Sequence, residues 1–296
     1  MVSRVTTSLL YRELVTRVGR LQTRLAAAND EVSSQRRLRE ASNDPSGAAL
    51  AARLQGEKAD VGAVRSALGF ATQVVARQDL ALDQSDRILA RAREIATLTA
   101  NGTATVESRQ QAAVEVAELE RGLLAQANTE LSGRYVFAGL TSGAAPFASL
   151  DDSGFDPLNP YSGPATPFLV RSGPDQTVAI TTPGDQVFEP AIAAIDGLRV
   201  ALAAGQAPTA SIDELDDAAT VLRAERTIVG GRARRLSERD GDLNAVELNL
   251  EKRLGTVQGA DLTESISRLV QLQTALQATL EAGRTLQASL LDSIQL

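Results

Sequence analysis

Apolar residues recur along most of this chain in the steps of three and four that are typical of paired helices. Near the N-terminus these steps join Tyr11, Leu14, Val18, Leu21, Leu25, Ala28 and Val32. Further along, an apolar residue returns at every seventh position, at Leu54, Val61, Leu68, Val75, Leu82 and Leu89. Such a stripe covers only one side of a helix, so a partner helix must bury it. The pattern therefore predicts coiled-coil helices.

The second half of the chain continues the pattern. A turn is expected at 100–103 (ANGT), and residues 106–131 predict a helix that returns antiparallel to the preceding one. The seven-residue repeat resumes at Leu236, Leu243, Leu250 and Val257, and an apolar face follows at Leu262, Ile266, Leu269, Leu276, Leu280 and Leu290. A helix from residue 46 to residue 99 would be roughly 80 Å long. These lengths favour a long antiparallel rod formed by the N- and C-terminal segments.

The middle of the chain has a different composition. Eight of the ten prolines lie between Pro146 and Pro190, and seven of the nine Phe and Tyr residues lie between Tyr135 and Phe188. Short alternating stretches at 134–139, 168–170 and 177–181 predict strands separated by Gly/Pro turns. The sequence thus predicts a small, exposed, β-rich insert within a mainly α chain. Three parts are expected: a terminal coiled-coil domain (1–42 with 258–296), a helical rod domain (43–134 with 191–257) and an outer domain (135–190).

The helical pattern is interrupted once near the N-terminus, in the stretch REASNDPSGAAL (39–50). Asp44 can cap the helix that restarts here, and Pro45 suits its first position, where the missing N–H costs nothing. Asn43, because it precedes a proline, is pushed out of helical geometry. We therefore interpret Asn43, Asp44 and Pro45 as a cap and a joint between helices, in preference to a ligand site.

Composition limits the chemistry that this chain could perform. It has no His and no Cys, which excludes imidazole catalysis, thiol chemistry, disulfides and the usual zinc ligands. The net charge of −7 argues against a nucleic-acid partner, and no apolar run is long enough for a transmembrane helix. Acidic residues at 150–157 lack the glycine that a calcium loop requires, and VGGRARR (229–235) lacks the Lys-Ser/Thr of a phosphate loop. We expect a turn and a helix start at Gly230-Gly231, no cofactor and no bound metal.

Four stretches resemble the bacterial flagellin family. LREASNDPSGAAL (38–50) is similar to the loop at which a terminal helix of that family passes into its rod helix. Within the family, RVTTSLLY (4–11), GRYVFAGLTSGAAPF (133–147) and residues 227–269 are similar to the hook-filament junction proteins rather than to filament flagellins. The resemblance covers the chain outside residues 148–226, and the double glycine at 230–231 departs from it.

The resemblance implies a structural, non-enzymatic subunit of the bacterial flagellum. Copies of the chain would form a ring-like layer between hook-associated protein 1 and flagellin, after export of the unfolded chain by the flagellar type III apparatus. A cytoplasmic chaperone is expected to hold the C-terminal helix before export, and the assembled protein would be extracellular. The terminal helices should order on assembly. Contacts within and between copies are expected at six residues: Val18, Leu21, Leu25, Leu276, Leu280 and Leu290.

Three alternatives remain at this point. A short flagellin that forms the filament itself would show the same order of parts. A cytoplasmic coiled-coil signalling rod would explain the heptads but would need neither a β-rich insert nor export. An enzyme would require a pocket in the insert with clustered carboxylates.

Overall fold

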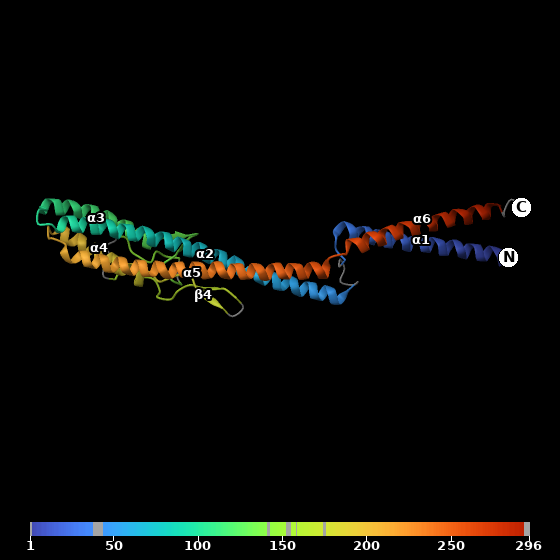
Figure 1. Ribbon diagram of the computed structural model, residues 1–296, viewed down its shortest axis with the longest axis horizontal. Helices are drawn as coiled ribbons and strands as arrows, with labels where there is room; N and C mark the ends of the chain where they lie inside the picture. The colour runs from blue at the N-terminus through green and yellow to red at the C-terminus, as the bar shows by residue number, and fades with distance from the viewer. Residues whose placement is uncertain are drawn as a thin grey trace. The chain divides into compact units, whose positions relative to one another are not determined.

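The computed structural model describes residues 2–37, 44–140, 143–151, 155–157, 159–173 and 176–292. Within these ranges the chain forms six helices and two small antiparallel sheets (Figure 1). The predicted mainly α class, with few and short strands, is confirmed. Contacts divide the chain into a first unit, residues 1–59 with 247–296, and a second unit, residues 60–246.

The first unit pairs the two ends of the chain. Helix α1 (Val2–Ser34) packs along α6 (Leu262–Asp292), and neither helix contains a proline that would interrupt its hydrogen bonds. The side of α1 that faces α6 carries the predicted stripe: Leu14, Val18, Leu21 and Leu25 are half-buried, and Ala28 is buried. The unit also contains the first turns of α2 (Pro45–Ala100) and the last turns of α5 (Thr209–Gln258).

The second unit has a continuous apolar core. The remaining parts of α2 and α5 contribute to it together with α3 (Val106–Ala127) and α4 (Asp185–Ala203), and α3 packs on α4. The heptad predicted for α2 is confirmed by burial: Val61 is half-buried, and Leu68, Val75, Leu82 and Leu89 are at most 1% exposed, as is Leu54 in the first unit. On α5 the same holds for Leu236 and Leu243, and for Leu250 in the first unit, which are all buried.

The prediction of a turn and a helix start at Gly230-Gly231 is wrong. Helix α5 runs without a break from Thr209 to Gln258, and a side chain added at either glycine would meet no atom within 4 Å. Two glycines cost helix stability, by about 1 kcal/mol each relative to alanine. Here the cost is offset because Val229 and Leu236, on either side of them, are buried in the core.

The middle segment forms two separate hairpins. Strand β1 (Glu130–Leu131) pairs with β2 (Arg134–Tyr135), and β3 (Leu169–Arg171) pairs with β4 (Thr177–Ala179), both antiparallel. The positive φ angles of Ser132 (53°) and Gly133 (78°) close the first, two-residue turn. The predicted strands at 134–139 and 177–181 overlap with β2 and β4 but are longer than these, and the one at 168–170 has the length of β3 but starts one residue earlier.

The expectation that this segment is exposed is wrong for its aromatic residues. Phe137, Phe147 and Phe188 are each at most 2% exposed and belong to the core of the second unit. The rings of Phe137 and Phe188 meet edge to face, with centroids 4.8 Å apart. The side chain of Asn128 holds the backbone of Phe147 in place, accepting from its N–H at 3.0 Å and donating to its carbonyl at 2.9 Å. The aromatic composition therefore reflects attachment to the helices and not an independent insert.

Arg109 connects the ends of two helices in the second unit. Its Nε donates to the carbonyl of Thr99, near the end of α2, at 3.0 Å, and its Nη1 donates to the carbonyl of Gly205 at 3.2 Å. Gly205 follows α4 with a φ of 72°, a conformation in which only glycine is unstrained. A cation at two helix C-termini is favourable because unpaired carbonyls gather there.

Candidate functional site

The two linkers of the first unit pair with each other where α1 ends and α6 begins. The backbone N–H of Arg37 donates to the carbonyl of Gln258 at 2.9 Å, and the N–H of Ala260 donates to the carbonyl of Gln35 at 3.0 Å. Arg36 and Gly259 form an isolated antiparallel bridge between these bonds. Gln35 has a φ of 54°, which ends α1 abruptly. The linkers therefore form a hydrogen-bonded joint, which the sequence did not predict as a pair.

Each helix that follows a linker starts with an aspartate cap. Asp44 Oδ1 accepts from the N–H of Gly47 and from the hydroxyl of Ser46, both at 2.8 Å, and Pro45 is the first residue of α2. These bonds, led by the one from Gly47, lower the pKa of Asp44. Asp261 Oδ1 accepts from the N–H of Thr263 at 2.9 Å at the start of α6. Asn43, the third residue of the predicted joint, lies outside the described residues.

A polar contact joins α1 and α6 next to this joint. Ser265 is only 2% exposed and donates from its hydroxyl to Oε1 of Glu31 at 2.9 Å. Arg268 lies 3.5 Å from the other oxygen of Glu31. A buried polar contact among apolar neighbours favours one alignment of two helices over others, because any shift would leave the polar groups unpaired.

The six residues predicted to form the assembly interface differ in how far they are buried. Val18, Leu21 and Leu25 on α1, and Leu276 on α6, are half-buried on the faces along which these helices pack. Leu280 is 47% exposed, and the side chain of Leu290 lies outside the described part of the chain. Whether any of these residues contacts a neighbouring copy stays a prediction.

Helix α6 has a second apolar stripe that α1 does not cover. Its members are 40–52% exposed: Leu262, Ile266, Val270 and Leu280. Their spacing of four residues between the first three places these on one side of the helix. On α1, Leu9 and Val15 are more than half exposed as well. Contiguous exposed apolar residues of this kind are typical of surfaces that bind another protein.

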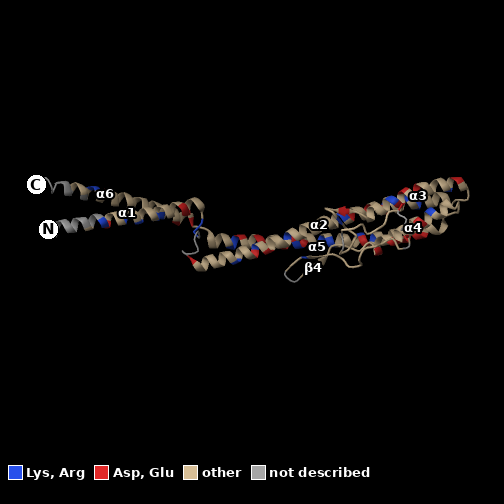
Figure 2. Cartoon of the chain, turned by 180° about the vertical axis from the view of Figure 1, so that it is seen from behind, with Lys and Arg blue, Asp and Glu red and all other residues tan. Residues whose placement is uncertain are grey.

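Ion pairs connect α2 and α5 at several points, and Figure 2 shows basic and acidic residues interspersed along both helices. Lys58 pairs with Glu251 at 2.6 Å, Arg65 with Asp240 at 3.0 Å, and Arg226 with Asp79 at 2.9 Å; Arg93 and Asp216 form a further pair. From Lys58 to Arg93 the residue number rises by 35 along α2, and from Glu251 to Asp216 it falls by 35 along α5, as antiparallel helices require. The sign of the charge on α2 changes twice along this series. A register shift would bring like charges together, so the pattern favours one alignment.

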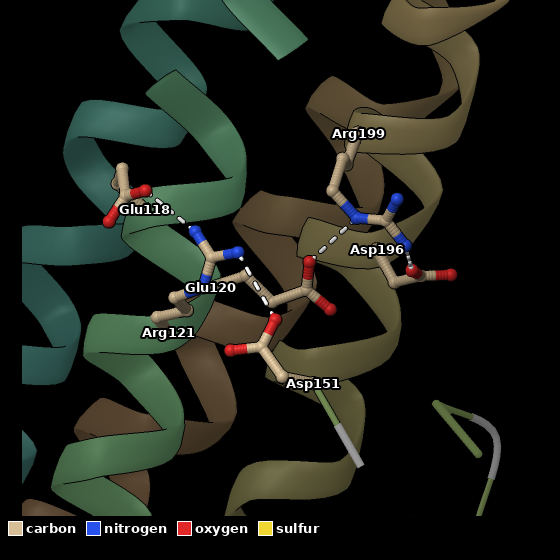
Figure 3. Close-up of polar contacts among 6 residues, drawn as sticks. All are labelled: Glu118, Glu120, Arg121, Asp151, Asp196 and Arg199. Carbon is tan, nitrogen blue, oxygen red and sulfur yellow. Dashed lines mark hydrogen bonds and ion pairs between the residues drawn. The ribbon is translucent and has the colours of Figure 1, made fainter. Parts of the chain in front are cut away.

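Figure 3 shows the most deeply buried charge of the second unit, Glu120 on α3. Arg199 on α4 donates to its Oε2 at 2.8 Å, and Arg199 also pairs with Asp196. Burial raises the pKa of Glu120 against the opposing effect of Arg199. Outside this buried pair, Arg121 bonds to Glu118 at 2.6 Å and to Asp151 at 3.3 Å (Figure 3). The arrangement fastens α3 to α4.

A groove of about 550 Å³ lies along the second unit, between α2, α5 and the β3–β4 hairpin. Val61, Val64 and Leu243 form apolar parts of its lining, and Arg171 and Arg239 lie at the hairpin side. No group of three or more acidic residues suited to a metal ion occurs among the described residues. No helix in the described ranges has the length and apolarity to cross a membrane.

Comparison with known proteins agrees with this arrangement of paired terminal helices. Residues 5–142 match the family described as the bacterial flagellin N-terminal helical region. Residues 5–142 are thus similar to the N-terminal helical region of flagellins, and the resemblance derived from the sequence is confirmed.

Similarity to flagellar hook-associated protein 3 extends over almost the whole chain. The protein of Escherichia coli (strain K12) is 28% identical over 314 residues, which cover 96% of this chain and 97% of that protein. The protein of Salmonella typhimurium is 29% identical over 145 residues, which cover 49% of this chain and 46% of that protein. The similarity therefore includes both the terminal helices and the middle segment.

Solved structures show that the fold is shared. A structure from Vibrio parahaemolyticus, described as a flagellar hook-associated protein, has a TM-score of 0.65 at 20% identity and covers 73% of this chain and 100% of its own. FlgL from Bacillus cereus has a TM-score of 0.58 at 18% identity, with 69% and 99% covered. At these identities the likeness concerns the fold alone.

Proposed function

We propose that this chain is a structural subunit of the bacterial flagellum that joins the hook to the flagellin filament. The observation that carries the proposal is the end-to-end similarity to hook-associated protein 3 of Escherichia coli, which includes 97% of that protein. A flagellin that forms the filament is supported less, because the family match at residues 5–142 fits both kinds of protein. The role requires binding and assembly and no catalysis.

In this proposal the chain acts in three parts. Residues 1–42 with 258–296 form the terminal domain through which copies assemble, 43–134 with 191–257 form the helical rod domain, and 135–190 form the outer domain. The exposed apolar stripe of α6, which includes Ile266 and Val270, supports an assembly role for the terminal domain. The partners are further copies of the chain, hook-associated protein 1 on one side and flagellin on the other.

Export and localisation belong to the same proposal. The chain would leave the cytoplasm unfolded through the flagellar type III apparatus, after a cytoplasmic chaperone has released its C-terminal helix. A chain without cysteine suits this route because no disulfide can form before assembly. The assembled protein would be extracellular, at the junction of hook and filament.

Immunogold labelling of isolated flagella tests the proposal. Label confined to the junction is expected, whereas label along the filament would support the flagellin alternative. Label absent from the flagella, with all the protein in the cytoplasm, would contradict both. A strain that lacks the gene should build hooks without filaments and release flagellin into the medium. Truncation after Gly259, which removes α6, should have the same effect as deletion of the gene.

A further inference from the structure

The outer side of α1 carries unpaired positive charge. Arg12, Arg17, Arg20 and Arg24 are all exposed. Within the part of the chain that the structure describes, none of their side chains forms an ion pair. Glu13 is the only acidic residue among them. Most arginines along α2 and α5 do have carboxylate partners, so these four differ from the general arrangement of charge in this chain.

The geometry of α1 places this charge beside the seam with α6. Residues three, four and seven positions apart lie on one side of a helix, so Arg17, Arg20 and Arg24 share a side. The residues that pack towards α6, such as Val18 and Leu21, lie next to this side, because Leu21 is four residues after Arg17. The arginine side therefore borders the apolar seam between α1 and α6, but its side chains are exposed and have no ion partner on α6 among the described residues.

A matching set of negative charges occurs near the start of α5, in the sequence DELDD (213–217). Asp213, Glu214 and Asp217 are exposed and have no ion partner among the described residues, whereas Asp216 pairs with Arg93. These acids follow the first turn of α5, which itself contains none. The helix dipole, whose effect ends within that turn, therefore does not account for them.

We infer that the arginine face of α1 binds the acidic face of α5 residues 213–217 in a second copy of this chain. Charges three and four residues apart project on one side of each helix, so two helices laid side by side can form several ion pairs at once. Unpaired charges of one sign repel one another within each face, and this repulsion is relieved when the two faces meet. The overall charge of −7 disfavours nucleic acid as the occupant of the arginine face. The inference rests on the proposed function, in which copies of the chain assemble.

The absence of native cysteine makes a direct test possible. Full-length Arg20→Cys and tagged full-length Asp217→Cys are mixed and oxidised, and the disulfide-linked heterodimer is quantified. Since each variant has a single cysteine, such a link can join only two copies. The heterodimer is expected at low salt and should fall at least several-fold in 1 M salt, because screening weakens exposed ion pairs. The control replaces Asp217→Cys by Ser237→Cys, an exposed position on the same helix outside the acidic face.

Charge reversal around the cysteines tests the complementarity itself. Adding Arg17→Glu and Arg24→Glu to the first variant should lower the yield of heterodimer at least tenfold. Adding Asp213→Arg and Glu214→Arg to its partner should then restore the yield. Circular dichroism of each variant checks that the helices are retained.

Three results would overturn the inference. The heterodimer could be no more abundant than with Ser237→Cys, the yield could be insensitive to charge reversal, or the reversed partner could fail to restore it. Binding of the wild-type chain to vesicles of anionic lipid, lost in the Arg17→Glu and Arg24→Glu variant, would instead assign the arginine face to a membrane. If labelling places the protein at the junction but no heterodimer forms, the inference alone fails. If the heterodimer forms but the protein is absent from flagella, the proposed function alone fails.

Discussion

Arg199 and Glu120 form an ion pair in which the carboxylate has no contact with water. The Nε of Arg199 donates to Oε2 of Glu120 at 2.8 Å, and Glu120 is 0% exposed. The other oxygen, Oε1, has no hydrogen-bond partner among the described residues. The buried charge therefore depends on one arginine, which ties helix α3 to helix α4.

Removing that arginine should be costly. Arg199→Ala leaves Glu120 buried without a counter-charge, and we expect the free energy of unfolding to fall by about 3–5 kcal/mol. The control is Arg121→Ala, which removes exposed ion pairs from the same cluster and should leave the melting temperature nearly unchanged. Denaturant titration followed by circular dichroism measures both. If Arg199→Ala and Arg121→Ala lowered the free energy of unfolding equally, burial would not be the reason that the Arg199–Glu120 pair stabilises the fold.

Glu120 should also make stability depend on pH. Because burial raises its pKa in the folded chain above the ordinary value of 4.5, the folded state takes up this proton at a higher pH than the unfolded state. The contribution of Glu120 to the free energy of unfolding therefore rises as the pH falls through the folded pKa, and the rise is complete below 4.5.

Glu120→Gln keeps the shape of the side chain and removes its charge, so this contribution should disappear. The variant should be at least as stable as the wild type at neutral pH and should lose the advantage in acid. Glu118→Gln, at an exposed position of the same helix, serves as the control and should keep the wild-type profile. An unchanged profile for Glu120→Gln would mean that Glu120 does not titrate as described.

The heptads of α2 were predictable because burial repeats with the helical period. Leu68, Leu82 and Leu89 each lie in the core, and their spacing of seven or fourteen residues is visible without any knowledge of partners. On α6 the spacing of apolar residues predicted burial correctly for some positions and not for others. Leu269 and Leu276 face α1, whereas Leu262 and Ile266 belong to a second stripe that stays exposed. A helix with two apolar stripes does not reveal from its sequence which one its partner covers.

The joint and the buried ion pair were only partly predictable. Asp44 and Pro45 follow local rules of helix starts, so their positions could be derived from sequence. The pairing of residues 35–37 with 258–260 depends on backbone groups more than 200 positions apart, which no local pattern encodes. Glu120 occupies an ordinary position in a charged helix, and only the packing of α4 against α3 buries it.

The cap of α2 should respond to acid in the opposite sense to Glu120. The hydrogen bond from Gly47 lowers the pKa of Asp44 below its ordinary value of 3.8. The stabilisation is therefore present above that value and is lost as the pH falls through the folded pKa. We expect Asp44→Ala to speed amide exchange at Gly47 and Ala48, with Asp44→Asn close to wild type because asparagine also caps helices. Identical exchange in Asp44→Ala and the wild type would contradict the assignment of the cap.

The register of α2 can be tested with two leucines that are two positions apart. Leu82 is 0% exposed and Leu80 is 44% exposed. Leu82→Ala should lower the free energy of unfolding by about 2–5 kcal/mol because it opens a cavity in the core. Leu80→Ala should change it by no more than about 0.5 kcal/mol. A larger loss for Leu80→Ala would mean that the helix presents a different side to its partners.

Because the middle segment is attached to the helices, substitutions of its buried and its exposed residues should differ in their effect on stability. Phe147 is 2% exposed, with its ring 5.9 Å from that of Phe188 on α4, whereas Leu169 on β3 is 52% exposed. Phe147→Ala should lower the free energy of unfolding by about 3–5 kcal/mol. Leu169→Ala, in the same segment, should have an effect within about 0.5 kcal/mol.

The measurement for Phe147 must report on the helices and not on the middle segment alone. Thermal melting followed by helical circular dichroism does so, because the signal comes almost entirely from α1 to α6. A lower midpoint for Phe147→Ala, with one cooperative transition for the second unit, would show that residues 137–188 and the helices share one core. If Phe147→Ala left the helical transition of the wild type unchanged, the segment would be an independent insert, as its composition first indicated.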